Sequence, residues 1–260
     1  VPDVKNSIVI FKETKIMEYG LQMYSVRDFA KDDLLGTLKK VGEIGYKDIE
    51  FAGFFGNSAE DIRRVLDENG LVCNGTHTGI GELDNDFAAT VKFQHTIGST
   101  NFIVPWADTS TKEKLDELIE KLNKYQPMLK AEGINLAFHN HSGEFLKNKD
   151  GLIPHIEMQK RTSIDFEIDT CWAYVAGLNP VDVITELKDR VHVIHLKDIV
   201  KTPEGKHEGR ALGEGEAPVA AVYARAKELG MRMVVESENL NPDGLSEVTR
   251  CMNYLRSLEK

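Results

Sequence analysis

The segment INLAFHNH, residues 134–141, is an apolar run that ends in two histidines, and it sets a pattern for the rest of the chain. The segments SIDFEIDT (163–170), VHVIHLKD (191–198) and MRMVVESE (231–238) repeat it, each ending on or next to ionisable side chains. Burial alone gives a strand no reason to end in this way. Polar strand ends that converge are typical of a barrel whose carboxyl rim carries one polar site.

Eight strands of this kind are expected, with helical patterns between them. Five of the helical stretches end in a glycine, the residue that best suits the left-handed position closing a helix; these are Gly45, Gly70, Gly98, Gly133 and Gly230. Strands that alternate with helices predict parallel βαβ units and therefore a single (β/α)₈ TIM barrel, an α/β fold. The expected strands cover residues 19–24, 46–51, 71–77, 101–106, 134–140, 164–169, 191–196 and 231–237.

The length agrees with this fold, because the chain has 260 residues and such barrels take about 250. We expect one barrel domain over residues 16–260 and an N-terminal extension over residues 1–15, which fit no repeat unit. A helix is expected over 111–132, with an apolar stripe of Leu115, Leu118, Leu122 and Met128. Residues 198–216 are expected to form a long loop at the rim, of the kind that is usually functional or mobile.

The composition narrows the choice of partners. The chain has 32 Lys plus Arg against 42 Asp plus Glu, a net charge of −10, and no basic cluster that would follow a phosphate backbone. No apolar run approaches the roughly 20 residues that span a bilayer. We therefore expect a small-molecule partner and neither nucleic acid nor membrane, with homo-oligomerisation left open. The three cysteines are widely spaced, which favours the reduced cytoplasm, although a removed leader stays open because the sequence begins at Val1.

Alternation along each strand predicts which side chains face the barrel interior. His139 and His141 share a face of the fifth strand, and Asp165, Glu167 and Asp169 share a face of the sixth. His195 and Lys197 share a face of the seventh strand, and Glu236 and Glu238 share a face of the eighth. Asp169, His195 and Glu236, with one ligand from the fifth strand, form a mixed nitrogen and oxygen set. Such a set predicts a divalent metal site for Mn²⁺, Co²⁺, Zn²⁺ or Mg²⁺.

The chain also resembles a known family. The segments GLQMYSVRD (20–28), THTG (76–79), AFHNHSGEF (137–145), EIDTCWA (167–173), VHVIHLKD, LGEGE (212–216) and VVESE (234–238) are similar to those of the xylose isomerase-like TIM barrels. That family includes sugar phosphate isomerases and epimerases, inosose dehydratases, dehydroshikimate dehydratases and endonuclease IV. The resemblance runs from about Gly20 to the C-terminus. It implies a TIM barrel and chemistry on a carbohydrate.

The resemblance implies a ligand set as well. Family members take one metal ligand from each of the last four strands, generally Glu, Asp, His and Glu, and the last three match Asp169, His195 and Glu236. Many members read Glu-x-His where this chain reads His139-Asn140-His141. Either His139 is the fourth ligand or Glu144 takes that place.

Proton chemistry is implied at two further positions. In dehydratase members, the histidine two residues after the first ligand and the lysine two residues after the histidine ligand move protons, which corresponds to His141 and Lys197 here. A histidine near its ordinary pKa is a competent base at neutral pH. Lys197 is expected to act as an ammonium or as a base, or else to form an ion pair with an inward carboxylate such as Glu167. Glu50 is a candidate for a second proton shuttle.

The remaining candidates are substrate contacts. Polar rim residues suit a polyhydroxy ligand, Arg210 suits a phosphate or carboxylate, and Trp106 and Trp172 offer flat surfaces to a sugar ring. The predicted substrate-binding residues are Gln22, His77, Trp106, Glu144 and Arg210. Barrel-mouth structure is the alternative role for Gln22, Glu50 and His77, and aromatic packing at the rim is the alternative for Trp106 and Trp172.

These features predict a metal-dependent isomerase or epimerase that removes a proton next to the carbonyl of a keto-sugar or sugar phosphate. A lyase of the inosose dehydratase or 3-keto-glycoside type shares the same enolate and is the alternative. A catalytically silent sugar-binding barrel is a third reading. A nuclease is disfavoured by the acidic charge and by Trp172, which stands where endonuclease IV has a histidine ligand.

Overall fold

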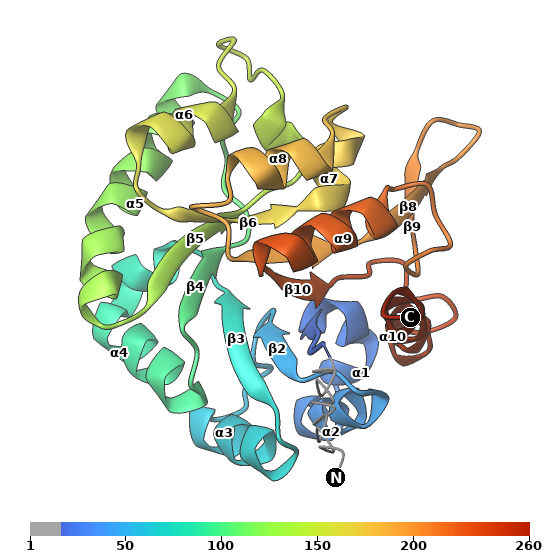
Figure 1. Cartoon of the computed structure of the whole chain (residues 1–260). Helices are drawn as coiled ribbons and strands as arrows, with labels where there is room; N and C mark the ends of the chain where they lie inside the picture. Colours follow the sequence, from blue (N-terminus) through green and yellow to red (C-terminus); the bar gives the residue numbers. More distant parts are fainter. Residues whose placement is uncertain (1–16) are drawn as a thin grey trace, which may run out of the picture.

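The computed structural model describes residues 17–260, so the expectation about residues 1–15 lies outside the described part of the chain. Eight parallel strands form a closed barrel in the order β1-β2-β3-β4-β5-β6-β7-β10, and β10 pairs with β1 (Figure 1). All eight lie where the sequence predicts strands, which confirms the single TIM barrel. They are β1 (Gly20–Gln22), β2 (Asp48–Phe51), β3 (Val72–His77), β4 (Asn101–Val104), β5 (Asn135–His139), β6 (Asp165–Asp169), β7 (Val193–Leu196) and β10 (Arg232–Val235).

Helices connect the strands and form the outer layer of the barrel (Figure 1). None of those in the described residues is long and apolar enough to cross a membrane. Short 3₁₀ turns follow β1 (Met23–Val26) and β5 (Gly143–Phe145). The α-helices are α1 (Arg27–Ala30), α2 (Leu34–Ile44), α3 (Ala59–Glu68), α4 (Gly81–Ile97), α5 (Lys112–Ala131), α6 (Pro154–Arg161), α7 (Thr170–Val175), α8 (Pro180–Glu186), α9 (Val219–Leu229) and α10 (Gly244–Leu258).

Helix α5 is the predicted helix, with Thr111 as its N-cap and Glu132 as its C-cap. Its predicted apolar stripe is correct at Leu115, Leu118 and Leu122 and wrong at Met128, whose side chain is exposed. At 100° per residue, Met128 lies well away from the face that the three leucines share. Other residues complete the buried face, namely Ile119, Tyr125 and Leu129.

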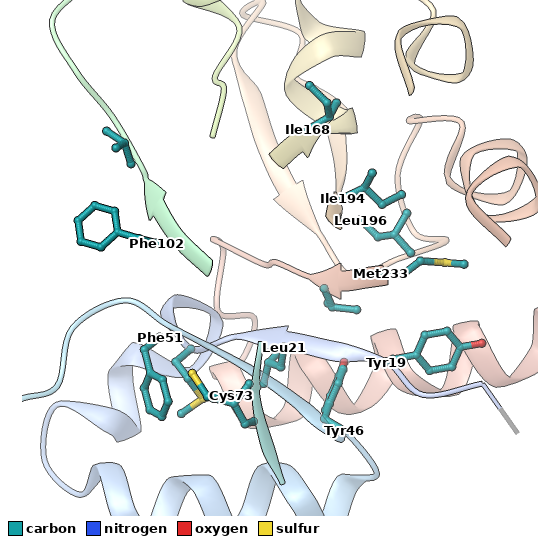
Figure 2. Close-up of a cluster of buried hydrophobic side chains, with 14 of the residues drawn as sticks. Tyr19, Leu21, Tyr46, Phe51, Cys73, Phe102, Ile168, Ile194, Leu196 and Met233 are labelled. Atoms are coloured by element: carbon teal, nitrogen blue, oxygen red, sulfur yellow. The ribbon is translucent and has the colours of Figure 1, made fainter. Parts of the chain in front are cut away.

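Most of the apolar core lies between the barrel and its helices. Alternate strand residues such as Leu21, Ile168 and Ile194 are fully buried there, and Figure 2 shows them with other members of the cluster. The residues between them face the barrel interior, where apolar side chains such as Ile103 and Val234 lie below the polar side chains of the strand ends. Burial of one face of each strand against the helices therefore determines which side chains point inward. The polar side chains at the strand ends consequently point into the barrel mouth.

The segment after β7 differs from the predicted loop. It contains an antiparallel hairpin of β8 (Asp198–Lys201) and β9 (His207–Arg210), which projects from the barrel (Figure 1). The return segment is held by the Asp198 carboxylate, which accepts backbone N–H groups of Gly213, Gly215 and Ala217 at 2.9–3.0 Å. A Cβ on Gly215 would lie 2.1 Å from Asp198 Oδ1, so glycine is required for this close approach.

Candidate metal centre

Four ionisable side chains meet inside the carboxyl end of the barrel. His139 and Asp169 end β5 and β6, His195 lies in β7, and Glu236 directly follows β10. One potential ligand atom from each lies within 4.8 Å of the others. All four residues are buried, with at most 6% of their surface exposed. The structure thus brings together the four residues that the sequence predicts as metal ligands.

Hydrogen bonds between neighbouring strand ends hold this cluster in place. Asn140, fully buried, donates its side-chain amide to the backbone oxygen of Asp169 and accepts the Asp169 N–H, at 3.2 and 3.1 Å. Thr170 donates its hydroxyl to the backbone oxygen of His195 at 2.8 Å. The sequence reading missed Asn140. The sequence does contain a sign of this role. Asn140 is polar, although alternation along the strand points its side chain away from the barrel interior.

The cluster fits a divalent cation. Both ring nitrogens of His139 and Oδ2 of Asp169 are buried and have no hydrogen-bond partner within the described chain. Buried polar atoms are normally satisfied, so unpaired atoms facing one another indicate a ligand that they share. Two imidazoles with two carboxylates suit Mn²⁺, Co²⁺ or Zn²⁺ better than Mg²⁺, which prefers oxygen ligands and water.

A second polar layer lies against His195. Glu50 Oε1 is 2.8 Å from His195 Nε2, and the same oxygen accepts a hydrogen bond from Gln22 Nε2 at 2.7 Å. His77 Nε2 lies 2.7 Å from Glu167 and 3.1 Å from Glu50. Three residues that the sequence assigns to substrate or proton transfer, Gln22, Glu50 and His77, thus contact one another or His195. The other ring nitrogen of His195, Nδ1, is hydrogen-bonded to Glu236 Oε2 at 3.3 Å, so a carboxylate lies at each nitrogen of this imidazole.

The two histidines of the cluster have opposite protonation tendencies. Burial lowers the pKa of His139 well below its ordinary value, and the neighbouring His195 and His77 lower it further. Burial would also lower the pKa of His195, but the carboxylates of Glu167 and Glu50 outweigh it and raise that pKa well above its ordinary value. Without metal at neutral pH, His139 is therefore neutral and His195 is an imidazolium.

Metal binding is consequently expected to release protons at neutral pH. A histidine must be neutral to coordinate, so the proton on His195 must leave while His139 loses none. Release of about one proton per metal is expected, and metal affinity should rise with pH until the raised pKa of His195 is passed. Calorimetric titration of Mn²⁺ or Zn²⁺ in buffers of different ionisation enthalpy measures the number. Binding with no proton release would contradict this assignment.

The geometry also bears on whether His139 or Glu144 is the fourth metal ligand. Glu144 is buried, and its Oε2 accepts the backbone N–H of His141 at 2.8 Å. This bond occupies the carboxylate in shaping the turn after β5, while His139 belongs to the ligand cluster.

We expect His139→Ala to weaken metal affinity by more than the ~10–100-fold that is typical of losing an outer partner of a ligand. Glu144→Gln, which keeps an oxygen for the His141 N–H, should leave affinity nearly unchanged. Calorimetry on both variants checks this. The reverse ranking would make Glu144 the fourth ligand.

Lys197 lies beside the cluster and is almost fully buried. Its Nζ donates to Glu238 at 2.5 Å and to Glu236 at 3.2 Å, and lies 3.7 Å from Asp169 and 5.0 Å from the centre of the Trp172 ring. The alternative role, an ion pair with an inward carboxylate, is found with Glu236 and Asp169 rather than with Glu167, which pairs with His77 deeper in the barrel. Burial would lower the pKa of Lys197, but the carboxylates of Glu236, Asp169 and Glu238 raise it, so the side chain is an ammonium.

His141 lies at the mouth, half-buried. Its ring centre is 5.2 Å from that of His139 and 5.9 Å from that of Trp172. His141 Nδ1 has no hydrogen-bond partner in the described chain. Trp172 therefore covers both His141 and Lys197, a contact that spacing alone could not reveal.

Two predicted substrate contacts lie apart from this group. Trp106 follows β4 and is 64% exposed. Arg210, at the end of β9, pairs with Glu208 at 3.0 Å on the same hairpin strand.

Known proteins share this architecture. The inosose dehydratase of Geobacillus kaustophilus is 21% identical over 188 residues, which cover 63% of this chain and 61% of that protein. A sugar phosphate isomerase/epimerase from Parabacteroides distasonis superposes with a TM-score of 0.80 at 19% identity, over 99% of this chain and all of that one. A probable 3-DHS dehydratase from Bacillus anthracis gives 0.74 at 11% identity, covering 92% and 99% of the two chains.

These structural likenesses show a shared fold. The chain matches less than two thirds of the length of the curated dehydratase. The model of one family, the xylose isomerase-like TIM barrel, matches residues 38–257, which include every residue of the cluster. This chain belongs to the xylose isomerase-like TIM barrel family.

Proposed function

We propose that this protein is a divalent-metal-dependent carbon–oxygen lyase that acts on a keto-sugar. One observation carries the proposal: a base candidate, His141, and an ammonium, Lys197, which follow β5 and β7, both lie beside the cluster of four ligands. The dehydratase relatives support an elimination, and the family supports a carbohydrate substrate.

His139, Asp169, His195 and Glu236 would hold the cation. When bound, it would supply Lewis-acid polarisation of the sugar carbonyl. Glu50 would orient His195 from behind, and Asn140 would fix the relative positions of the ends of β5 and β6. These residues form a buried site, and burial strengthens the electrostatic contacts within it.

His141 would take the proton from the carbon next to the carbonyl, and the C–H electron pair would form an enolate. As the enolate collapses to a carbon–carbon double bond, the C–O bond at the next carbon breaks. The departing oxygen takes a proton from the Lys197 ammonium. The products are an enone and water or an alcohol, and both residues then return to their starting state by proton exchange with solvent.

The contacts of Glu50 assign it to positioning rather than to proton transfer. An epimerase that inverts a carbon through an enolate uses a base on one face and an acid on the other, and Glu50 was the sequence's candidate for the second group. Glu50 is fully buried, and burial alone would raise its pKa. The histidines His195 and His77 outweigh burial and lower that pKa. A carboxylate so engaged is suited to positioning and poorly suited to proton transfer.

An isomerase or epimerase is the second candidate, supported by the sugar phosphate isomerase/epimerase of closely similar fold. One experiment separates the two. Purified protein is analysed for bound metal, loaded with Mn²⁺, Co²⁺ or Zn²⁺, and given a panel of keto-sugars and keto-glycosides. A lyase yields a conjugated enone, seen by its ultraviolet absorbance, whereas an isomerase yields an isomer without it. A protein that binds sugar but neither binds metal nor turns over any member of the panel would be a silent barrel, against the proposal.

A further inference from the structure

A second group of side chains that can bind a metal lies deeper in the barrel than the candidate metal centre. This inner group consists of His77, His139, Glu167 and His195, from β3, β5, β6 and β7. One potential ligand atom from each lies within 4.8 Å of the others, and no side chain of the group is more than 8% exposed. The inner group shares two histidines with the outer cluster of the candidate metal centre and has His77 and Glu167 in place of its two carboxylates.

Strand β6 provides one carboxylate for each of the two levels. Glu167 and Asp169 lie on the same face of β6, and Glu167 comes two residues earlier, about 6.6 Å deeper along the strand. The two shared histidines reach both levels. His195 Nε2 lies 3.2 Å from Glu167, and His139 Nε2 lies 3.8 Å from Asp169. The two histidines therefore lie between an outer and an inner position for a cation.

Each shared histidine has two ring nitrogens, and the outer cluster can use only one of them. In His195, Nδ1 contacts Glu236 of the outer cluster at 3.3 Å, whereas Nε2 contacts Glu167 of the inner group. In His139, neither ring nitrogen has a hydrogen-bond partner among residues 17–260. A histidine that binds metal through one nitrogen almost always has a partner at the other. A single ion in the outer cluster would leave the second nitrogen of His139 buried without one.

The inner group also has too few hydrogen-bond donors for its carboxylate oxygens. His77 Nε2 lies 2.7 Å from Glu167 and 3.1 Å from Glu50. His195 Nε2 lies 3.2 Å and 2.8 Å from the same two carboxylates. Each nitrogen carries at most one proton, so two protons serve four contacts. Oε1 of Glu167 and Oε2 of Glu50 are buried and unpaired within the described chain. Buried carboxylates of this kind are normally paired with a cation or bound to a metal.

We propose that the inner group is a second metal site, suited to Zn²⁺, which fills after the outer cluster. Its ligands are His77, Glu167 and the second ring nitrogens of His139 and His195. Three imidazoles with one carboxylate are ligands that Zn²⁺ accepts, whereas Mg²⁺ prefers oxygen ligands and water. Four protein ligands in a buried position leave no place for substrate, which is typical of a structural zinc site. The inner ion would fix the two histidines that hold the outer one.

The shared histidines determine the order in which the sites fill. When the second ion binds, His139 and His195 each lose their remaining ring proton to solvent and bridge the two ions as imidazolates. An ion already bound at the first nitrogen makes this proton easier to lose, because a bound cation favours the deprotonated form of its ligand. The purified protein is therefore expected to contain about one ion per chain, and the second is expected to enter in excess Zn²⁺. This site does not depend on which reaction the protein performs.

Equilibrium dialysis of the full chain against excess Zn²⁺, followed by elemental analysis, tests the inference. About two zinc ions per chain are expected. His77→Asn with Glu167→Gln should lower the number to about one and keep the outer ion. Asp165→Asn with His192→Asn is the matched control, because this pair, 3.5 Å apart, joins the same types of side chain at the other end of the barrel. The control variant should still bind two ions.

Anomalous diffraction from zinc-loaded crystals of the unmodified chain locates the ions, and it decides the question even if the variant does not fold. A peak between His77 and Glu167 is expected. A single peak at the outer cluster, a second peak outside the barrel, or a second ion that persists in the His77 and Glu167 variant would overturn the inference. None of these measurements uses a substrate. Two ions without elimination would overturn the proposed function alone, and elimination by a chain that takes up only one ion would overturn this inference alone.

Discussion

Replacing His141 with asparagine is expected to slow turnover by a factor of about 10²–10⁴ while the metal stays bound, since that is the usual contribution of a positioned general base. Asparagine keeps a polar side chain of similar size beside Trp172 but cannot accept the substrate proton. Steady-state kinetics on the keto-sugar identified by the panel, together with metal analysis of the same sample, measures both quantities.

His192→Asn is the matched control for this variant. His192 lies just before β7 at the opposite end of the barrel, and its side chain is 65% exposed. The same substitution there should leave kcat/KM unchanged. If His141→Asn retains full turnover, or loses its metal, then His141 is not the base.

The second large effect is expected from Asp169→Asn combined with Glu236→Gln, which should abolish metal binding. The two substitutions keep side-chain shape, and the new amide oxygen at position 169 could still accept the Trp172 N–H that Asp169 accepts at 2.8 Å. They remove both negative charges from the ligand set, so divalent affinity should fall below detection by elemental analysis. Asp165→Asn with Glu208→Gln removes the same charges away from the cluster and should retain about one ion per chain. A double variant at 169 and 236 that still retains the metal would place the ion elsewhere.

The sequence was most informative where a physical constraint acts on every residue of a segment. Burial of Leu136, Phe138 and Ile168 against the helices fixes the opposite direction of His139 and Asp169. Alternation along the strands therefore predicted which side chains meet at the mouth. The glycines that end helices could be predicted for a similar reason. Gly98 and Gly230 have φ of +76° and +68°, a backbone conformation that glycine adopts more readily than other residues.

Contacts between strands distant in sequence could not be read in this way. The sequence indicated that Glu50, Glu167 and Lys197 face inward, but the partner of each depends on how the barrel closes. Closure places Glu50 and Glu167 each within 2.7–3.2 Å of both His77 and His195. It places Lys197 beside Glu236 and Glu238. The β8–β9 hairpin was missed because it packs little of its surface. Its outer residues, such as Lys201 and His207, are exposed and give no apolar alternation.

Solvent exchange during turnover tests the central claim most directly. The metal-loaded protein is incubated with its keto-sugar in D₂O, and proton NMR follows the hydrogen on the carbon next to the carbonyl. Proton abstraction at that carbon predicts that its hydrogen is lost to solvent: the enone product lacks it, substrate recovered before completion carries deuterium in its place where abstraction is reversible, and both changes stop when a chelator removes the metal. An isomeric product that keeps the original hydrogen and carries no deuterium would contradict the account and indicate a hydride shift within the bound sugar.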